Sequence, residues 1–328
     1  MSGRRTNLAL LGLTIVAVLS GFTAFTVGTA SGTWVVIVHS LFGLSILLLA
    51  PWKTVIARRG LARNDGTRWI SVTLAIVAIA TLMSGVALIS GESDRIGPLT
   101  MTQIHVGGGV FALALTLVHY KQRPVTPRTT DMNRRNAVRS AGLLGASAIA
   151  YLIGEWTLEV TGARGADRRF TGSHEIELGR RVPPTQWLND SVQDLDTRAH
   201  LVATPRGPLT AADIDRVGES ITATLDCTGG WYANRTWSGV RLDRVLADTR
   251  GESVVVRSVT GYWRRFPLTQ ADRLWLVTRL EGEALRPGNG APIRLVAPDR
   301  RGFWWVKWVD EVEVDDLPNW FQPPLPLA

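Results

Sequence analysis

Long apolar stretches dominate the first half of the chain, and only short ones occur in the second half. Five long stretches precede residue 161: Leu8–Gly28, Thr33–Ala50, Trp69–Ser90, Gln103–Tyr120 and Ala137–Val160. A helix needs about 20 mostly apolar residues to cross a bilayer, because lipid offers the backbone no hydrogen-bond partners. The pattern therefore predicts an α-helical membrane bundle of five spans over residues 1–160. The first stretch is interpreted as a retained span rather than a cleaved signal peptide, because four more spans follow it.

After residue 160 the apolar runs shorten to the length of β-strands. Segments rich in β-branched and aromatic residues, separated by Gly and Pro, occur at Ile221–Leu225, Ser253–Val259, Leu274–Arg279, Ile293–Ala297 and Phe303–Val314. Such segments predict a second, α+β domain over residues 161–328. A domain of this size buries a core without disulfides. The single cysteine of the chain excludes an intrachain disulfide framework and a multi-cysteine metal site.

Basic residues are concentrated in connections between alternate spans. Residues 1–139 contain 14 Lys/Arg and 4 Asp/Glu, whereas residues 140–328 contain 22 and 24. The second-to-third connection holds Lys53, Arg58, Arg59, Arg63 and Arg68, and the fourth-to-fifth is equally basic. The positive-inside rule then predicts a multi-pass protein of the cell membrane with a cytoplasmic N-terminus and an extracytoplasmic C-terminal domain. Because that domain is slightly acidic, no nucleic-acid partner is expected.

Two adjacent arginines, Arg134 and Arg135, precede the Gly/Ala-rich fifth stretch. This arrangement resembles a twin-arginine signal, which exports proteins already folded. Such an export route suits a domain that acquires a cofactor in the cytoplasm. The alternative is that both arginines only add to the positive charge on the inner side.

Three of the five histidines, His39, His105 and His119, lie in or at the ends of the predicted spans. Ionisable residues in lipid are costly and are functional candidates. The second and fourth spans both run from outside to inside, so His39 and His105 lie near the outer face. They are candidate ligands of one haem iron through neutral imidazole nitrogens. The alternatives are hydrogen bonding between helices and a proton path in a transporter.

His119 follows His105 by fourteen residues, on nearly the same helix face and about 21 Å further along the axis. That spacing suits two haems stacked across a bilayer, as in the four-helix b-type cytochromes that this half resembles. His119 is then a candidate ligand of an inner haem b. The corresponding residue after His39 is Lys53, which departs from the pattern.

Cys227 follows a strand-like segment directly and enters a Gly229-Gly230 turn. A sulfur at a strand-to-loop junction can point into a cleft, where a thiolate binds a soft metal or acts as a nucleophile. A nucleophilic role needs a base within reach, and the outer histidines, His174 and His200, lie in no recognisable motif. A structural, nucleophilic or metal-binding cysteine all remain open on this reasoning.

Three ordered blocks add a resemblance. They are Leu225–Trp231 with Trp237–Leu242, then Gly288–Pro298, then Gly302–Trp308. The second contains Asn289-Gly290-Ala291-Pro292-Ile293-Arg294, and the third ends in Val306-Lys307-Trp308. Together they resemble the sulfite-oxidase-type molybdopterin domain, over roughly residues 168–320.

The resemblance implies a cofactor and a set of site residues. Cys227 would supply the protein thiolate to molybdenum. The molybdopterin and its phosphate would be held by Asn289, Arg294, Trp305, Val306 and Lys307, with Arg168, Thr171, Gly172 and Ser258 as further candidates. Arg and Lys side chains and backbone N–H groups are the donors that a phosphate requires. Without the resemblance, Arg294 and Lys307 would be ordinary surface charges.

The residues around the cysteine also bear on the substrate. Tyr232 and Arg264 are candidate catalytic residues, and Tyr262 and Arg265 are further candidates for a substrate pocket. Sulfite oxidases of the vertebrate type carry an arginine just before the cysteine, where this chain has Asp226. A carboxylate there repels sulfite. Methionine-sulfoxide reductases, which share the fold and the asparagine of the second block, are an alternative.

Taken together, these features predict a membrane-anchored molybdenum oxidoreductase that transfers an oxygen atom to or from a small substrate. The cofactor carries that chemistry, and the protein positions it. Electrons would be exchanged through the membrane haem with a quinone or a cytochrome. The alternative from another class is a cofactor-free binding or assembly module tethered to the bilayer.

Overall fold

The computed structural model describes residues 3–61, 68–91, 95–131, 133–185, 191–247 and 249–323. Arg63, one of the basic residues expected between the second and third spans, lies outside these residues. The chain forms two compact units, residues 1–174 and residues 175–328. Each unit is described by itself below.

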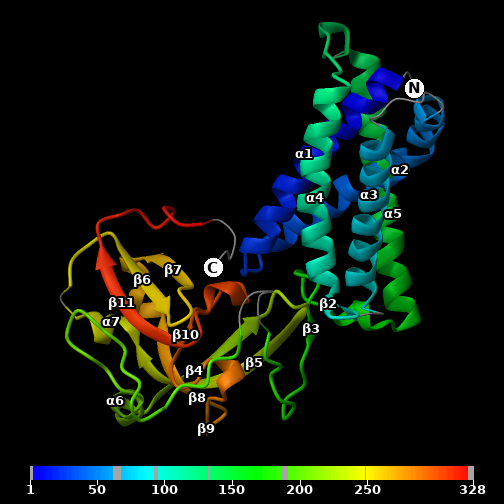
Figure 1. The fold of residues 1–328 in the computed structure, drawn as a ribbon. Coiled ribbons are helices and arrows are strands. Elements are labelled where there is room, and N and C mark those ends of the chain that lie inside the picture. The colour runs from blue at the N-terminus through cyan, green and yellow to red at the C-terminus, as the bar shows by residue number, and fades with distance from the viewer. Residues whose placement is uncertain are drawn as a thin grey trace. The chain divides into compact units, whose positions relative to one another are not determined.

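Five long helices make up most of the first unit (Figure 1). They are α1 (Gly3–Thr26), α2 (Gly32–Leu61), α3 (Arg68–Ser90), α4 (Met101–Gln122) and α5 (Arg134–Thr161). All five are long and apolar enough to cross a membrane, by length and composition. The five predicted spans are thus confirmed as helices, each of which contains at least the greater part of its predicted stretch. The twin arginines are the first two residues of α5.

The helices of the first unit pack as two hairpins, α1 with α2 and α3 with α4, and α5 packs on α2. Apolar faces in lipid give no hydrophobic drive between helices, so small polar side chains become important at the contacts. The buried hydroxyls of Ser45 in α2 and Ser147 in α5 lie 2.7 Å apart. The short hairpin β1 (Arg95–Ile96) and β2 (Leu99–Thr100) leads into α4, whose first turn is closed by a capping box of Thr100 and Gln103.

The second unit contains a six-stranded and a three-stranded sheet (Figure 1). The larger sheet has the order β10 (Arg294–Val296), β8 (Trp275–Leu280), β5 (Trp231–Arg241) and β3 (His174–Glu175). In addition, β4 (Glu219–Asp226) pairs with β5, and β9 (Glu283–Ala284) pairs with β8. The smaller sheet has the order β11 (Val309–Asp315), β6 (Ser253–Ser258) and β7 (Trp263–Pro267). Two short helices, α6 (Ala211–Val217) and α7 (Leu242–Leu246), accompany the sheets.

Besides the two-residue strands β3 and β9, the strands β5 and β7 were not predicted. β5 is the longest strand, and its second half coincides with the Trp237–Leu242 part of the first sequence block. Its alternation is interrupted by a register shift at Ser238–Gly239, where a Cβ on Gly239 would come within 2.0 Å of the Leu276 carbonyl oxygen. β7 holds two adjacent arginines, which conceal its strand pattern. A central bulge and buried charges are features that a pattern of alternating polarity does not reveal.

One predicted strand begins later than expected. The segment Phe303–Val314 was predicted as one strand, but Gly302–Trp304 form a 3-10 helix and β11 starts only at Val309. Gly302 lies against the backbone of the cysteine loop, since a Cβ there would be 3.1 Å from Cys227 Cα. This close approach turns the chain away from a strand.

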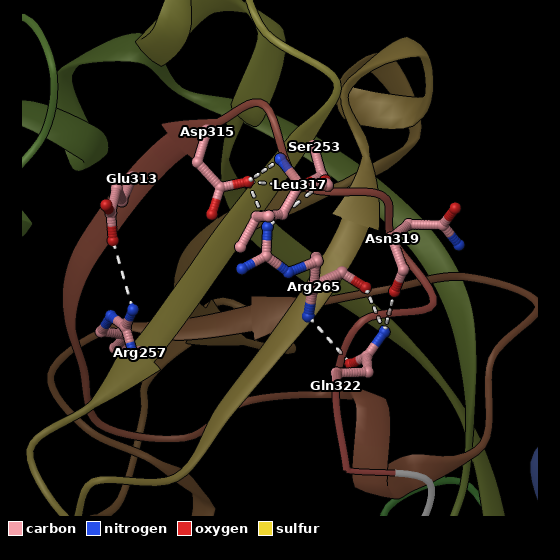
Figure 2. A network of polar contacts seen from close by, with 8 residues as sticks. All are labelled: Ser253, Arg257, Arg265, Glu313, Asp315, Leu317, Asn319 and Gln322. Carbon is pink, nitrogen blue, oxygen red and sulfur yellow. Dashed lines mark hydrogen bonds and ion pairs between the residues drawn. The ribbon is translucent and has the colours of Figure 1, made fainter.

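A polar network joins the last residues of the second unit to the smaller sheet (Figure 2). The buried guanidinium of Arg265 in β7 pairs with the Asp315 carboxylate and donates 2.7 Å to Ser253 Oγ. The Gln322 side chain extends the edge of β7, because it accepts from Arg265 N at 3.1 Å and donates to Arg265 O at 2.9 Å. Covering an edge strand in this way prevents its pairing with another chain. Arg265 is therefore buried, and its side chain joins β7 to the residues that follow β11.

Replacement of Asp315 should destabilise the second unit. Burial raises the pKa of this carboxyl, but hydrogen bonds from Arg265 and Ser253 outweigh it, so the net pKa is lowered. A lowered folded-state pKa adds stability above the unfolded-state value of about 3.9, and this stability is lost as the pH falls below that value. We expect Asp315→Asn to lower the free energy of unfolding by about 1–3 kcal/mol at pH 7 and by much less below pH ~4.

The measurement is denaturant unfolding of the detergent-purified chain, followed by tryptophan fluorescence. The matched control is Glu313→Gln, which removes an exposed partner of Arg257 at 3.2 Å (Figure 2). Exposed pairs of this kind contribute at most about 1 kcal/mol. Equal effects of the two substitutions at pH 7 would contradict the assignment.

Candidate functional site

Cys227 lies directly after β4, in the tight turn that connects β4 to β5. Its backbone N–H donates to Trp231 O at 2.8 Å, and Gly230 N donates to Cys227 O at 3.2 Å. The thiol accepts from Gly229 N at 3.3 Å and interacts with the Thr185 hydroxyl. The residue is 7% exposed. The sulfur is thus held by donors at the end of a strand, as the sequence predicted, but it is buried.

A second segment approaches the cysteine through Thr185. Trp231 Nε1 donates to Thr185 Oγ1 at 3.1 Å. Lys307 Nζ donates to the carbonyl oxygens of Thr185 and Gly288 at 2.9 and 2.8 Å. The ammonium of Lys307 therefore ties the third sequence block to the second, and both to the residue that contacts the thiol.

Arg294 in β10 is a buried cation without a carboxylate partner among the described residues. It is 2% exposed, and its terminal nitrogens donate to Asn289 O at 3.0 Å and Trp305 O at 3.4 Å. Its guanidinium lies over the rings of Trp237 and Trp305, at 5.1 and 5.6 Å. Its Nε has no hydrogen-bond partner. Burial lowers the pKa of Arg294 to about 10, and the nearby Cys227 opposes this shift.

Arg301 is a second buried cation next to the cysteine. Its Nη2 donates to Cys227 O at 3.5 Å, its Nη1 lies 3.6 Å from Asp226 Oδ1, and its Nε has no hydrogen-bond partner. Both side chains of the ion pair are almost fully buried. The Asp226 carboxylate therefore faces a positive charge. The argument that Asp226 repels an anionic substrate assumed an unpaired carboxylate, and this pairing removes much of its force.

The electrostatics of this cluster favour an anion. Burial raises the pKa of the Cys227 thiol, while Thr185, Gly229, Lys307 and Arg301 act in the opposite direction. Buried polar atoms without partners are costly, and buried cations are normally paired. The unpartnered Nε atoms of Arg294 and Arg301 therefore leave donors in this cluster that a negatively charged group can use.

The structure brings most of the predicted cofactor residues together. Cys227, Asn289, Arg294, Trp305, Val306 and Lys307 belong to one hydrogen-bonded cluster, in which Leu295 N donates to Val306 O at 2.7 Å. Asn289 also anchors the chain before Thr185, because its Nδ2 donates to Val182 O at 3.3 Å. This grouping is what the three sequence blocks predicted.

Other predicted residues have partners elsewhere. Ser258 is buried at the end of β6, where its hydroxyl accepts from Thr260 N and Oγ1. Arg264 is 1% exposed and lies among the rings of Tyr262, Phe303 and Trp304. Its Nε donates to the Tyr262 hydroxyl at 2.6 Å and its Nη1 to Pro323 O at 2.9 Å. Arg264 thus supports the loop after Arg301 and does not face solvent.

Tyr232 and the early candidates are also accounted for. The Tyr232 hydroxyl lies 3.5 Å from Glu175 Oε2, at the start of β5. Arg168 belongs to the helical unit, where it pairs with Glu155 and donates to Gly165 O at 2.6 Å. Gly172 closes a turn in the same unit, in which its N–H donates to Arg169 O at 2.9 Å, and Thr171 precedes it. None of these contacts involves Cys227.

The helical unit contains a second site, in which two histidines face each other. Nδ1 of His39 lies 2.8 Å from Ala17 O, and Nδ1 of His105 lies 2.8 Å from Thr81 O. Because a carbonyl oxygen only accepts, each Nδ1 carries a proton, and in the neutral form each Nε2 presents a lone pair. The two Nε2 atoms lie 3.5 Å apart. Two lone pairs at this distance repel each other unless a proton or a metal lies between them.

The two hairpins build this site in the same way. In each hairpin, a glycine of the neighbouring helix faces the imidazole. A Cβ on Gly21 would be 2.8 Å from His39 Cε1, and a Cβ on Gly85 would be 2.9 Å from His105 Cε1. A serine precedes each glycine, and its hydroxyl lies 3.4 Å from the histidine Nδ1. Corresponding residues of α1 and α3 differ by 64 in number, and those of α2 and α4 by 66. The α1–α2 and α3–α4 hairpins of the helical unit thus place the same residue types at corresponding positions around their histidines.

The same correspondence identifies a second set of four residues, each fourteen residues along its helix from the outer set. This second set is called the lower level below. There the two glycine positions are taken by Asn7 and Ser71, and the two histidine positions by Lys53 and His119. Lys53 Nζ donates to Asn7 Oδ1 at 2.9 Å, and His119 Nδ1 lies 3.3 Å from Ser71 Oγ. Three of these four residues differ in type from their counterparts at the outer level, and only His119 corresponds to a histidine. His119 therefore has no facing imidazole.

Comparisons with known proteins bear on the second unit. Residues 194–320 match the family model described as oxidoreductase molybdopterin binding domain. Among solved structures, the chain is similar to the sulfane dehydrogenase SoxCD from Paracoccus pantotrophus, with 26% identity and a TM-score of 0.36. That similarity covers 38% of this chain and 40% of the other, so the chain spans less than half of the SoxCD chain that it matches. No curated protein matches.

The match with the oxidoreductase molybdopterin binding domain therefore lies wholly within the second unit. The matched residues contain Cys227 and all three sequence blocks, but they begin after Arg168, Thr171 and Gly172. They do not extend to the helical unit. Among the described residues, no group of three or more His, Cys, Asp or Glu side chains could hold a metal ion.

Two residues of the cysteine cluster were missed by sequence reasoning. Arg301 directly precedes Gly302, the first residue of the third block. This position could have identified Arg301 as a candidate from the sequence. Thr185 lies in a loop after Pro183-Pro184 and belongs to no motif. Only the contact with Cys227 reveals its role.

Burial of the thiol predicts slow alkylation. In chain produced without molybdopterin, we expect Cys227 to react with iodoacetamide at pH 8 at least tenfold more slowly than in the denatured chain, because the raised pKa and burial both reduce access to thiolate. The readout is mass spectrometry, which is unambiguous because the chain has one cysteine. Equal rates in the folded and denatured chain would contradict the buried placement.

Proposed function

We propose that the chain is a membrane-anchored molybdenum oxidoreductase. The observation that carries the proposal is the cluster of Cys227 with Arg294, Arg301 and Lys307 inside a molybdopterin-binding domain of the oxidoreductase type. A soft thiolate and several cations are the donor set that a molybdenum–pterin phosphate requires. The bound group would supply two-electron oxygen-atom transfer on a small substrate.

Each residue of the cluster has a role toward that group. Cys227 would be the thiolate ligand of molybdenum, and a coordinating thiol is deprotonated despite its burial. Arg294 and Lys307 would hold the pterin and its phosphate, together with Asn289 and the backbone of Trp305 and Val306. Arg301 would keep Asp226 neutralised beside the ligand. Gly229 and Thr185 would orient the sulfur.

The helical unit would hold one haem b between His39 and His105. Metal–imidazole bonds are about 2 Å long, so an iron would need the two nitrogens about 4 Å apart, slightly more than the 3.5 Å found here. Both Nδ1 atoms already donate to backbone carbonyls, which fixes the ring orientation and leaves Nε2 available. The haem would exchange electrons one at a time with a quinone or a cytochrome.

The membrane topology supports this arrangement. The asymmetry of basic residues favours a cytoplasmic N-terminus. With five spans, the molybdopterin domain then lies outside the cytoplasm, on the side where α2 and α4 carry His39 and His105. The twin arginines at the start of α5 fit an export route for a domain already loaded with cofactor.

Replacement of Arg294 should remove the cofactor. We expect Arg294→Met to lower the molybdenum content, measured by elemental analysis of the purified chain, at least tenfold from near one per chain. The matched control is Arg216→Met, whose side chain is 76% exposed and pairs with Asp213.

Cys227→Ala should abolish oxygen-atom transfer and leave any haem band intact. Absence of molybdenum from the wild-type chain would support the tethered binding module instead.

Replacement of either outer histidine should remove the haem. We expect His39→Leu and His105→Leu each to lose the b-type absorption band, because an iron retains only one imidazole ligand in these variants. The control is His200→Leu in the second unit, which loses only a hydrogen bond to Val309 O. A wild-type chain without a haem band would favour a proton path for these histidines.

A further inference from the structure

The lower level of the helical unit does not fit a second haem. At the outer level, Gly21 and Gly85 allow each imidazole to lie against a bare neighbouring helix. At the lower level, Asn7 and Ser71 fill those positions with side chains that themselves bond to Lys53 and His119. An ammonium that donates a hydrogen bond has no lone pair for iron. The residues of this level are therefore polar, but they do not include a pair of facing imidazoles that could bind an iron.

This level presents hydrogen-bond donors from inside the bundle. Asn7, Lys53, Ser71 and His119 come from α1, α2, α3 and α4, one from each helix. Lys53 and His119 interact electrostatically, and Arg123 at the end of α4 acts on both. Lys53 carries three N–H donors and uses one of them on Asn7. The other two N–H groups of Lys53 donate to none of the described residues, so they are available to a ligand at this end of the bundle.

We propose that Lys53 and His119 bind the headgroup of a quinone. Such a headgroup is flat, reaches the bundle from the lipid, and carries two carbonyl oxygens that accept from an ammonium and an imidazole on opposite sides. The neighbouring cations would also favour a reduced, negatively charged form of the ring. This inference rests on the proposed function in one respect, since it assigns the quinone partner to a place about 21 Å along the helix axis from the outer histidines.

The test is equilibrium binding of 2,3-dimethyl-1,4-naphthoquinone to the full chain in nanodiscs of uncharged phosphatidylcholine, with empty nanodiscs as the baseline. We expect saturable binding that weakens at least tenfold in Lys53→Met and in His119→Leu. Lys53→Arg and His119→Gln keep a donor and should bind within about threefold of the wild type. Lys121→Met is the matched control, because it removes an exposed lysine from the same end of α4, and it should bind like the wild type.

The haem band is measured in the same samples. Its presence in Lys53→Met and His119→Leu shows that the bundle is folded. Its absence from every sample, with quinone binding intact, would contradict the proposed haem but not this site. Wild-type affinity in Lys53→Met and His119→Leu would overturn the proposal. So would two haems per chain, or a Lys53-dependent retention of anionic phosphatidylglycerol in place of quinone binding.

Discussion

Positive charge that is buried without enough negative charge is the constraint on which the second unit depends. Arg294 is surrounded by two indole rings and two carbonyl oxygens, and Arg301 has a single buried carboxylate beside it. Buried charge without full pairing is costly, and an anion bound at this site would reduce that cost. The strands β4, β5 and β10 and the loop after Arg301 are arranged so that the thiol of Cys227 and these cations meet. The arrangement of these residues is therefore that of a site for an anion rather than that of an apolar core.

The helical unit follows a related rule in a different medium. Lipid does not drive helices together, so the unit is held by small residues and by hydrogen bonds between helices. Gly21 and Gly85 bring the imidazoles close to the opposite helices, and the serine pair Ser45 and Ser147 joins α5 to α2. Some of the side chains that form hydrogen bonds between helices, such as His39 and His105, are thus also residues of the candidate sites.

Much of this organisation was predictable from sequence, for identifiable reasons. The spans were predicted because a run of about twenty apolar residues is typical of a helix that crosses a membrane. Cys227, Asn289, Arg294 and Lys307 could be assigned to one part of the fold because they lie in ordered blocks. The burial of Arg264 and Arg265 in β7 was not predictable, since two adjacent arginines look exposed in a sequence. Thr185 and the pairing of Asp226 with Arg301 depend on contacts between distant segments, which no local pattern encodes.

The stacking of Arg294 between Trp237 and Trp305 has an optical consequence. The emission of an indole responds to a charge a few ångströms from its ring, and both rings are almost fully buried, so solvent contributes little to their spectra. An anion that neutralises the guanidinium would alter the field across both rings at once. If the proposed cofactor binds at Arg294, the emission of this pair of indoles should therefore change on binding.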